Sequence, residues 1–149
     1  MPWVQAQLNR GAFGVWGRKL PITEIQLPSD AAECYRLRKV ICCLASYALR
    51  DPDAVADVEV AVGEALSNAI KYGALGSKVT VRVEASLNYD LAIEMAYPGR
   101  RFDTAVTYPA NPGSGSGGFG RFIMKQLTDS MEYSFKNGHT TLRITKRRR

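Results

Sequence analysis

The chain has 149 residues, of which 46% are hydrophobic and 23% charged, and its formal net charge is +6. This length and composition fit one soluble globular domain with a substantial core, and no apolar run is long enough to span a membrane. Because the N-terminus also lacks a charged region followed by an apolar one, we expect no signal peptide and a cytoplasmic location.

Cysteine, histidine and charge patterns argue against several kinds of site. No C-x-x-C or Cys/His spacing occurs, so we expect reduced, buried thiols and no zinc or redox centre. His139 is the single histidine, which argues against Ser-His or Cys-His catalysis. We interpret residues 146–149 as a short solvated basic tail and favour this over a nucleic-acid-binding surface, because no basic stripe interleaved with aromatics occurs. The three cysteines fall in one expected helix: Cys34, Cys42 and Cys43.

The N-terminal part of the chain is irregular over residues 1–22, where glycines interrupt any period. We expect these residues to form an arm ahead of one domain over residues 23–149. Alternation at 24–27 predicts a first strand, and the polar residues after it predict a helix N-cap at Ser29 or Asp30.

Two helices are predicted next, because apolar residues recur at helical spacing along two consecutive segments. Asp51 or Asp53 could cap the second helix, and Gly73 and Gly76 end it. The inward residues are Leu37, Val40, Ile41, Leu44 and Ala48 in the first helix, and Val55, Val58, Val62, Leu66 and Ala69 in the second.

Two alternating segments then predict an antiparallel hairpin. Residues 78–85 place small apolar side chains on one face and polar ones on the other, as in a strand with one wet face. A turn at 88–90 leads to a second strand with Leu91, Ile93 and Met95 facing inward.

The chain from Tyr97 to Gly120 is loop-like and ends in a Gly/Ser run that leads directly into a helix. So long a loop in a compact domain is typical of a functional or mobile segment. Glycines before a helix N-terminus can bind phosphate through backbone N–H groups and the helix dipole, although such runs also form flexible linkers. The apolar residues of this helix are Phe122, Ile123, Met124 and Leu127.

A last hairpin is predicted from alternation at 131–136 and 140–145 around the Asn137-Gly138 turn. The order is therefore strand, two helices, hairpin, loop, helix and hairpin. Three helices on one face of a mostly antiparallel sheet make an α+β two-layer sandwich.

The second helix carries the first candidate site. Glu64 and Asn68 lie four residues apart on one helix face, among small residues that let a ligand approach. A Glu can accept a proton or orient a water, and an Asn amide oxygen can ligate Mg²⁺. The same pair is also common on solvated helix faces, so the rest of the chain has to decide between these interpretations.

Taken together, the order of elements, the E-x-x-x-N helix and the Gly-rich loop leading into residues 118–124 resemble the GHKL ATPase (Bergerat) fold, which includes gyrase and histidine kinases. The small size and the ending at 138–146 resemble most the anti-sigma regulatory factors, the serine protein kinases of bacterial partner-switching systems. This resemblance covers residues 24–146. It implies ATP and Mg²⁺ as cofactors, and as partner an anti-sigma-factor antagonist-like protein with a phosphorylatable serine, a sigma factor, or both. It also allows a homodimer.

The resemblance implies roles for individual residues. Glu64 would be the general base, and Asn68 would hold the Mg²⁺ that bridges the ATP phosphates. Lys71 could reach a phosphate, and Gly118 and Gly120 match the second glycine box at the helix N-terminus. The strand threonine that helps to hold adenine is matched by either of two neighbours, Thr140 or Thr141.

The first glycine box departs from the family pattern, D-x-G-x-G followed by F-D. Tyr97 stands where the adenine-reading Asp is expected, Arg101 replaces the second glycine, and Gly99 alone remains. A Tyr cannot accept the adenine amino hydrogens as a carboxylate does. In the absence of a lid Lys or Arg, the γ-phosphate would be neutralised by one of four cations: Lys71, Arg100, Arg101 or Arg121.

Two functions remain open from the sequence. The first is an ATP-dependent serine/threonine protein kinase that also sequesters a regulator, supported by Glu64, Asn68 and the second glycine box. The second is a regulatory protein-binding module that kept the fold and lost efficient nucleotide binding, supported by Tyr97 and Arg101.

Overall fold

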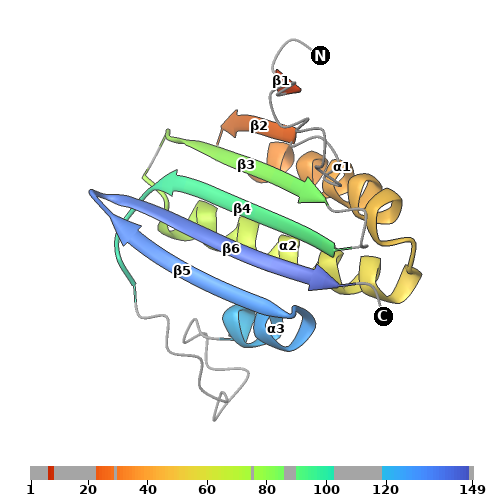
Figure 1. Cartoon of the computed structure of the whole chain (residues 1–149). Helices are drawn as coiled ribbons and strands as arrows, with labels where there is room; N and C mark the ends of the chain where they lie inside the picture. Colours follow the sequence, from red (N-terminus) through yellow and green to blue (C-terminus); the bar gives the residue numbers. More distant parts are fainter. Residues whose placement is uncertain are drawn as a thin grey trace, which may run out of the picture.

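The computed structural model describes residues 7–8, 23–28, 30–74, 76–85, 90–102 and 119–147 (Figure 1). Within these ranges six strands form one antiparallel sheet in the order β1-β2-β3-β4-β6-β5. The strands are β1 (Gln7–Leu8), β2 (Thr23–Pro28), β3 (Lys78–Ala85), β4 (Asp90–Pro98), β5 (Ser130–Lys136) and β6 (His139–Arg147).

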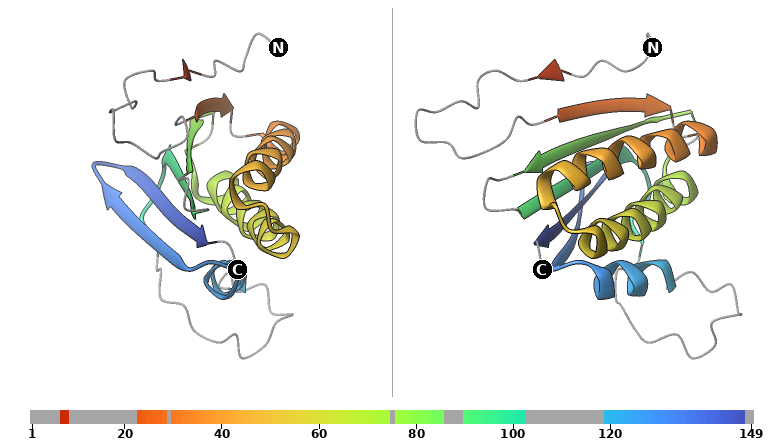
Figure 2. Two further views of the ribbon diagram at one scale, coloured as in Figure 1. Left: turned by 45° about the vertical axis from the view of Figure 1, so that its right-hand side comes forward. Right: turned by 90° about the vertical axis from the view of Figure 1, so that its right-hand side faces the viewer.

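Among the described residues, three helices lie on one face of the sheet and none lies on the other (Figure 2). They are α1 (Ala31–Leu49), α2 (Pro52–Tyr72) and α3 (Phe119–Leu127). α1 and α2 run along the sheet, and α3 lies beside α2 near β5 (Figure 1). The predicted α+β sandwich is confirmed.

Aspartates begin the two long helices, and each is one of the two cap residues predicted for its helix. The Asp30 side chain accepts hydrogen bonds from the N–H groups of Ala32 and Glu33, and Asp51 does the same at the start of α2. These bonds satisfy donors that the first turn of a helix leaves unpaired. At the other end of α2, Gly73 is the C-cap, and its N–H donates to the carbonyl of Ala69.

The core fills the space between the sheet and the helices. Small alanines on the buried side of α2 let this helix lie close to the strands. Burying each large side chain stabilises the fold by about 1.5–3 kcal/mol relative to exposure. The largest fully buried side chains are Tyr97, Ile41, Leu49, Leu91, Ile93, Met95, Met124, Leu142, Val58, Val62 and Val79.

Several sequence expectations are wrong in detail. Tyr97 belongs to β4 rather than to the loop, because the ladder with β6 continues to Pro98. Val40 is 40% exposed, since it lies on the flank of the buried stripe of α1. In α3, for which the sequence made no prediction of burial, Met124 is buried and Phe122 is partly covered.

The cysteine prediction holds only in part. All three thiols in α1 are free, as expected, and Cys34 is buried. Cys42 is partly covered and Cys43 is exposed, because they lie progressively further from the side of α1 that faces the sheet.

Two terminal segments are more ordered than expected. Gln7 and Leu8, in the expected irregular arm, pair with Glu24 and Thr23 of β2. Lys146, expected in a solvated tail, is buried in β6. No helix among the described ranges is long and apolar enough to cross a membrane.

Candidate functional site

The two segments that carry the predicted phosphate chemistry meet where α2 passes the N-terminus of α3. A Cβ added to Gly120 would lie only 2.6 Å from Oε2 of Glu64, so the carboxylate occupies the space of a side chain at position 120. Gly120 is the second residue of α3, where backbone N–H groups lack helical partners. The glycine therefore permits the carboxylate and the helix N-terminus to approach each other.

Asn68 lies one turn further along α2 and contacts the sheet. Its side-chain nitrogen donates a hydrogen bond of 3.4 Å to the Tyr133 hydroxyl on β5. This bond fixes the amide with its oxygen left for another partner. Burial raises the pKa of Tyr133, while the Asn68 bond and the charge of Arg121 act in the opposite direction.

The oxygen donors at this site can bind a Mg²⁺ ion that takes only one ligand from the protein. Mg²⁺ commonly keeps several waters and takes one or two protein oxygens plus substrate phosphates. Asn68 would supply such an oxygen. Among the described residues no group of three or more His, Cys, Asp or Glu side chains could hold a metal on its own, so phosphate oxygens and water would supply the other ligands.

An aromatic cluster lies next to Asn68 and joins three parts of the chain. Phe102, which follows β4, stacks on Tyr72 of α2 with a centroid distance of 4.5 Å. Its ring also makes edge contacts at 5.0 Å with Tyr133 and at 5.1 Å with Phe135. Offset and edge-to-face geometries such as these are the favourable ones for aromatic pairs. We refer to these four residues as the aromatic cluster.

Three of the predicted phosphate-neutralising cations lie against this cluster. The Lys71 ammonium is 5.2 Å from the Tyr72 ring, the Arg121 guanidinium 5.3 Å from the Phe102 ring and the Arg101 guanidinium 5.6 Å from the Phe135 ring. Arg121 is buried, with 8% of its surface exposed.

Two of these cations affect the pKa of the Tyr72 hydroxyl. Burial alone would raise the pKa of Tyr72, but hydrogen bonds to Arg121 and Lys71, and their charges, lower it below its usual value. These contacts hold positive charge close to the end of α2.

The predicted adenine end differs from a carboxylate site. Tyr97 and Thr140 face each other across β4 and β6 and are 2% and 0% exposed. Neither hydroxyl has a hydrogen-bond partner within the described parts of the chain. Burial raises the pKa of Tyr97 far above its usual value, so the phenol is neutral. Tyr97 therefore cannot replace the negative charge of an aspartate.

Gly99 and Gly73 lie beside the Tyr97 ring, and their missing side chains make room chiefly for the backbone carbonyl oxygens of Tyr72 and Ala69. A Cβ added to Gly99 would lie 3.3 Å from the ring, and one added to Gly73 would lie 3.5 Å from it. Of the two threonines matched to the family, Thr140 shares the helix-covered face with Tyr97, whereas Thr141 lies on the opposite face. Gly118, matched to the second glycine box, lies outside the described residues.

Sequence reasoning missed the aromatic cluster. Its residues come from α2, the segment after β4, and β5, so no local spacing connects them. The one available signal is Tyr133 and Phe135 at alternate positions of β5, which places both rings on one face.

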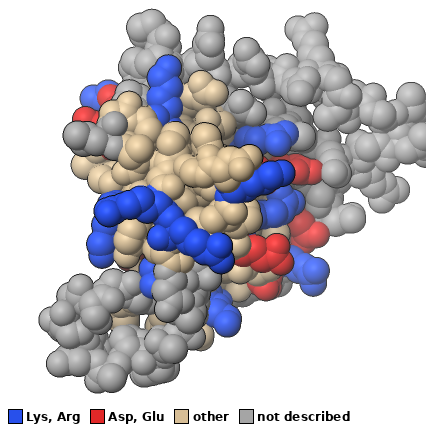
Figure 3. Space-filling view, turned by 90° about the vertical axis from the view of Figure 1, so that its left-hand side faces the viewer, with Lys and Arg blue, Asp and Glu red and all other residues tan. Residues whose placement is uncertain are grey.

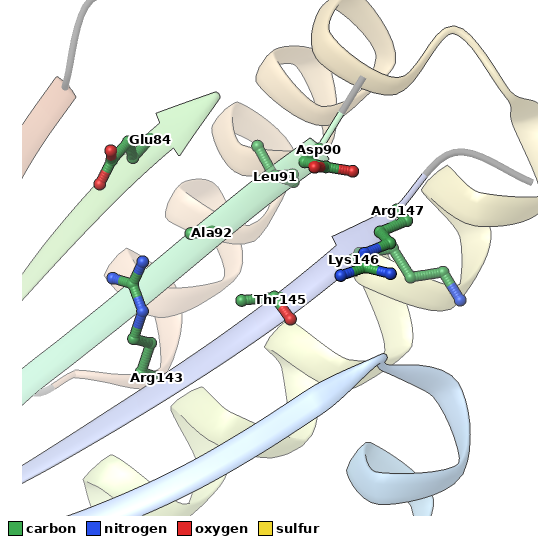
Figure 4. A pocket seen from close by; sticks show the side chains of 8 residues that line it. All are labelled: Glu84, Asp90, Leu91, Ala92, Arg143, Thr145, Lys146 and Arg147. Atoms are coloured by element: carbon green, nitrogen blue, oxygen red, sulfur yellow. The ribbon is translucent and has the colours of Figure 1, made fainter. Parts of the chain in front are cut away.

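Two further hollows are lined by neither Glu64 nor Asn68. One, between α1 and α2, is lined by Ala31, Cys34, Tyr35, Arg38, Gly63, Leu66, Ser67 and Ile70. The other lies at the far end of the sheet (Figure 4) and is lined by Glu84, Asp90, Leu91, Ala92, Arg143, Thr145, Lys146 and Arg147. Its charges are largely committed, because Arg143 pairs with Glu94 and Lys146 with Asp57.

Comparisons with known proteins agree with this architecture. A family model described as a histidine kinase-like ATPase domain matches residues 27–146. The crystal structure of the RsbU and RsbW domains of Rv1364c from Mycobacterium tuberculosis aligns over 86% of this chain and 32% of that chain, with 18% identity and a TM-score of 0.61. The histidine kinase domain of a blue-light activated histidine kinase from Erythrobacter litoralis aligns over 81% and 61%, with 16% identity and a TM-score of 0.53.

These structural matches bear on the fold alone, because both identities are low. The chain also spans less than two thirds of the length of either solved chain. A search of curated proteins found no match.

Proposed function

The chain belongs to the histidine kinase-like ATPase domain family, and from this premise we propose that it is an ATP- and Mg²⁺-dependent serine/threonine protein kinase. It would regulate a cytoplasmic partner by partner switching: an antagonist-like protein with a phosphorylatable serine, a sigma factor, or both. The observation that carries the proposal is the contact of the Glu64 carboxylate with Gly120 at the start of α3, with Asn68 one turn away.

The proposed mechanism assigns one task to each of these residues. Bound ATP would supply the phosphoryl group, and Mg²⁺ would offset the negative charge of the phosphates. Glu64 accepts the proton of the attacking serine hydroxyl as the oxygen–phosphorus bond forms and the bond to the leaving phosphate oxygen breaks. Asn68 would hold the cation through its amide oxygen, and N–H groups at the start of α3 would bind phosphate oxygens. Catalysis would come mainly from positioning and charge neutralisation.

A second candidate is a protein-binding module that works without nucleotide. The buried Tyr97 ring favours it, because this ring lies where the family pattern has a carboxylate. Such a module would bind its partner with the same affinity in the presence and absence of ATP.

Calorimetric titration with ATP and ADP, with and without Mg²⁺, separates the two candidates. The kinase predicts Mg²⁺-dependent binding with a Kd in the micromolar range, weakened by Asn68→Ala. Asn68→Asp is a useful companion variant, since it keeps an oxygen ligand and should retain metal dependence. If neither heat nor a thermal shift is observed at millimolar nucleotide, the kinase is excluded.

Glu64→Gln then tests the catalytic role. The amide keeps the shape of the side chain but cannot accept the proton, so phosphoryl transfer to a serine-bearing partner should fall by about 100-fold or more with ATP affinity nearly unchanged. Equal losses of binding and transfer would assign Glu64 to binding instead.

A further inference from the structure

Four exposed cations gather at one end of the sheet. They are Lys71 in the last turn of α2, Arg100 and Arg101 after β4, and Lys136 at the end of β5. We call this group the basic end. Figure 3 views the molecule from this side and shows Lys and Arg side chains running across it, with most of the visible Asp and Glu side chains to the right of them.

Backbone hydrogen bonds join the segments that carry these cations. The N–H of Arg100 donates to the carbonyl of Tyr72 at 3.3 Å, which ties the chain after β4 to the end of α2. The N–H of Gly99 donates to the carbonyl of Gly138 at 3.0 Å, which ties the same segment to the turn that follows Lys136. The basic end is therefore a fixed part of the fold.

The cations of the basic end have no counter-charge within the parts of the chain that the structure describes. No carboxylate there lies within 4.0 Å of any of the four side chains. Elsewhere among the described residues several cations are paired, in Arg36–Glu33, Arg38–Glu59, Lys39–Glu59, Arg143–Glu94 and Lys146–Asp57. The basic end thus gathers four cations at one end of the sheet without a paired carboxylate among the described residues.

The basic end borders the candidate site. Phe102 follows Arg101 directly, and its ring contacts Tyr133, whose hydroxyl accepts the hydrogen bond from Asn68. A protein segment bound over Arg100 and Arg101 would therefore lie beside the group that we expect to hold Mg²⁺.

We propose that the basic end docks an acidic segment of a protein partner. Guanidinium groups pair with carboxylates through two parallel hydrogen bonds, so Arg100 and Arg101 suit side-chain carboxylates well. A nucleic acid fits less well, because the exposed Glu132 of β5 would repel a phosphate backbone that continued across the sheet. That the acidic segment lies next to a phosphorylated serine depends on the proposed kinase activity. The docking of the segment does not depend on that activity.

Fluorescence anisotropy with labelled peptides tests the docking. The probes are a serine flanked by glutamates, the same peptide with lysines in place of the glutamates, and a single-stranded oligonucleotide of similar charge. The double variant Arg100→Glu/Arg101→Glu is compared with Arg36→Glu/Lys125→Glu, which makes an equal change of net charge at two exposed positions on α1 and α3. Circular dichroism checks that both variants fold.

We expect the wild-type chain to bind the glutamate peptide and not the lysine peptide. Reversing Arg100 and Arg101 should weaken glutamate-peptide binding about tenfold or more at low salt and create binding of the lysine peptide, because attraction becomes repulsion. The control variant should change affinity by no more than about twofold.

Several results would overturn the proposal. An equal loss in the control variant would assign the binding to net charge. Tighter binding of the oligonucleotide than of the glutamate peptide would assign the surface to nucleic acid. Competition by saturating Mg²⁺ and ATP would assign the cations to nucleotide phosphates, and no peptide binding at low salt would remove the docking surface. Because nucleotide affinity is measured separately, a failed kinase and a failed docking surface give different patterns of results.

Discussion

The Tyr97 hydroxyl is buried in the core and has no hydrogen-bond partner among the described residues. A buried polar group without a hydrogen bond costs about 1–3 kcal/mol of desolvation. Tyr97→Phe removes the oxygen and keeps the ring that fills the space beside Gly73 and Gly99. We therefore expect this variant to raise the free energy of unfolding by about 1 kcal/mol in urea titrations. Tyr133→Phe is the matched control and should lower it, because the Tyr133 hydroxyl accepts a hydrogen bond from Asn68.

The same residue predicts a pH dependence. Burial raises the pKa of Tyr97 in the folded chain, whereas an unfolded tyrosine titrates near a pH of about 10. Above that pH the unfolded chain loses the proton while the folded chain keeps it, so the stability contribution is present below about pH 10 and is lost as the pH rises. Urea titrations between neutral pH and pH 11 should show a steeper decline for wild type than for Tyr97→Phe. Parallel curves would contradict the burial argument.

At the scale of elements, the contact between α2 and α3 depends on a missing side chain. Gly120→Ala would place a methyl group 2.6 Å from the Glu64 carboxylate, which is the flexible end of its side chain and can move away. We expect a change of less than about 1 kcal/mol in stability, since alanine also favours a helix. Phosphoryl transfer should fall by about 100-fold, because the displaced base no longer meets the hydroxyl.

A double-mutant cycle identifies the cause of that loss. If Gly120→Ala acts through Glu64, adding it to Glu64→Gln should produce little further loss of transfer, because both changes remove the same function. If the double variant instead loses transfer activity by the product of the two single losses, Gly120 acts on the phosphates directly.

Lys146 connects three elements at the other end of α3. Its ammonium donates to Asp57 of α2 and to the carbonyl of Leu127, each at 2.8 Å, from a position that is 8% exposed. Lys146→Met keeps the apolar stem and removes both bonds, and we expect it to lower the free energy of unfolding by about 2–4 kcal/mol. Lys125→Met, at an exposed position of α3, should change it by less than about 0.5 kcal/mol. Equal effects in urea titrations would mean that the Lys146 bonds contribute nothing.

At the scale of the whole molecule, the sequence predicted what local patterns determine. Alternating valines in β3 and aspartate caps before α1 and α2 depend on neighbours in the chain, and those predictions are confirmed. Tyr97 was misplaced because the Pro98-Gly99 pair after it suggests a turn, whereas pairing with β6 extends the strand. Lys146 was misplaced because a run of like charges suggests solvent, and its partner Asp57 is far away in sequence.

The candidate site also has one part that local sequence patterns predict and another that depends on tertiary packing. The helical spacing of Glu64 and Asn68 is local and was available from the sequence. Their contacts with Gly120 and Tyr133 depend on how α3 and β5 pack against α2, which no single segment encodes. The aromatic cluster is the extreme case, since it exists only after three distant segments have come together.

That cluster links global stability to ligand access. Phe102 lies between Tyr133, which holds Asn68, and Arg121, which follows Gly120. A nucleotide bound between these groups would have to displace the Phe102 ring, and the free energy of that displacement reduces the apparent affinity. Phe102→Ala should therefore lower the free energy of unfolding by about 2 kcal/mol while raising ATP affinity by about tenfold.

Calorimetry with ATP and Mg²⁺, together with urea unfolding, measures both effects on one pair of variants. Tyr47→Ala is the control, because this tyrosine is 68% exposed on α1 and lies outside the aromatic cluster. It should affect stability and nucleotide binding less than Phe102→Ala does. If Phe102→Ala loses stability and binds ATP no better than wild type, the ring is structural support alone. If it gains affinity at the expense of stability, the chain holds its nucleotide site partly closed with its own aromatic core.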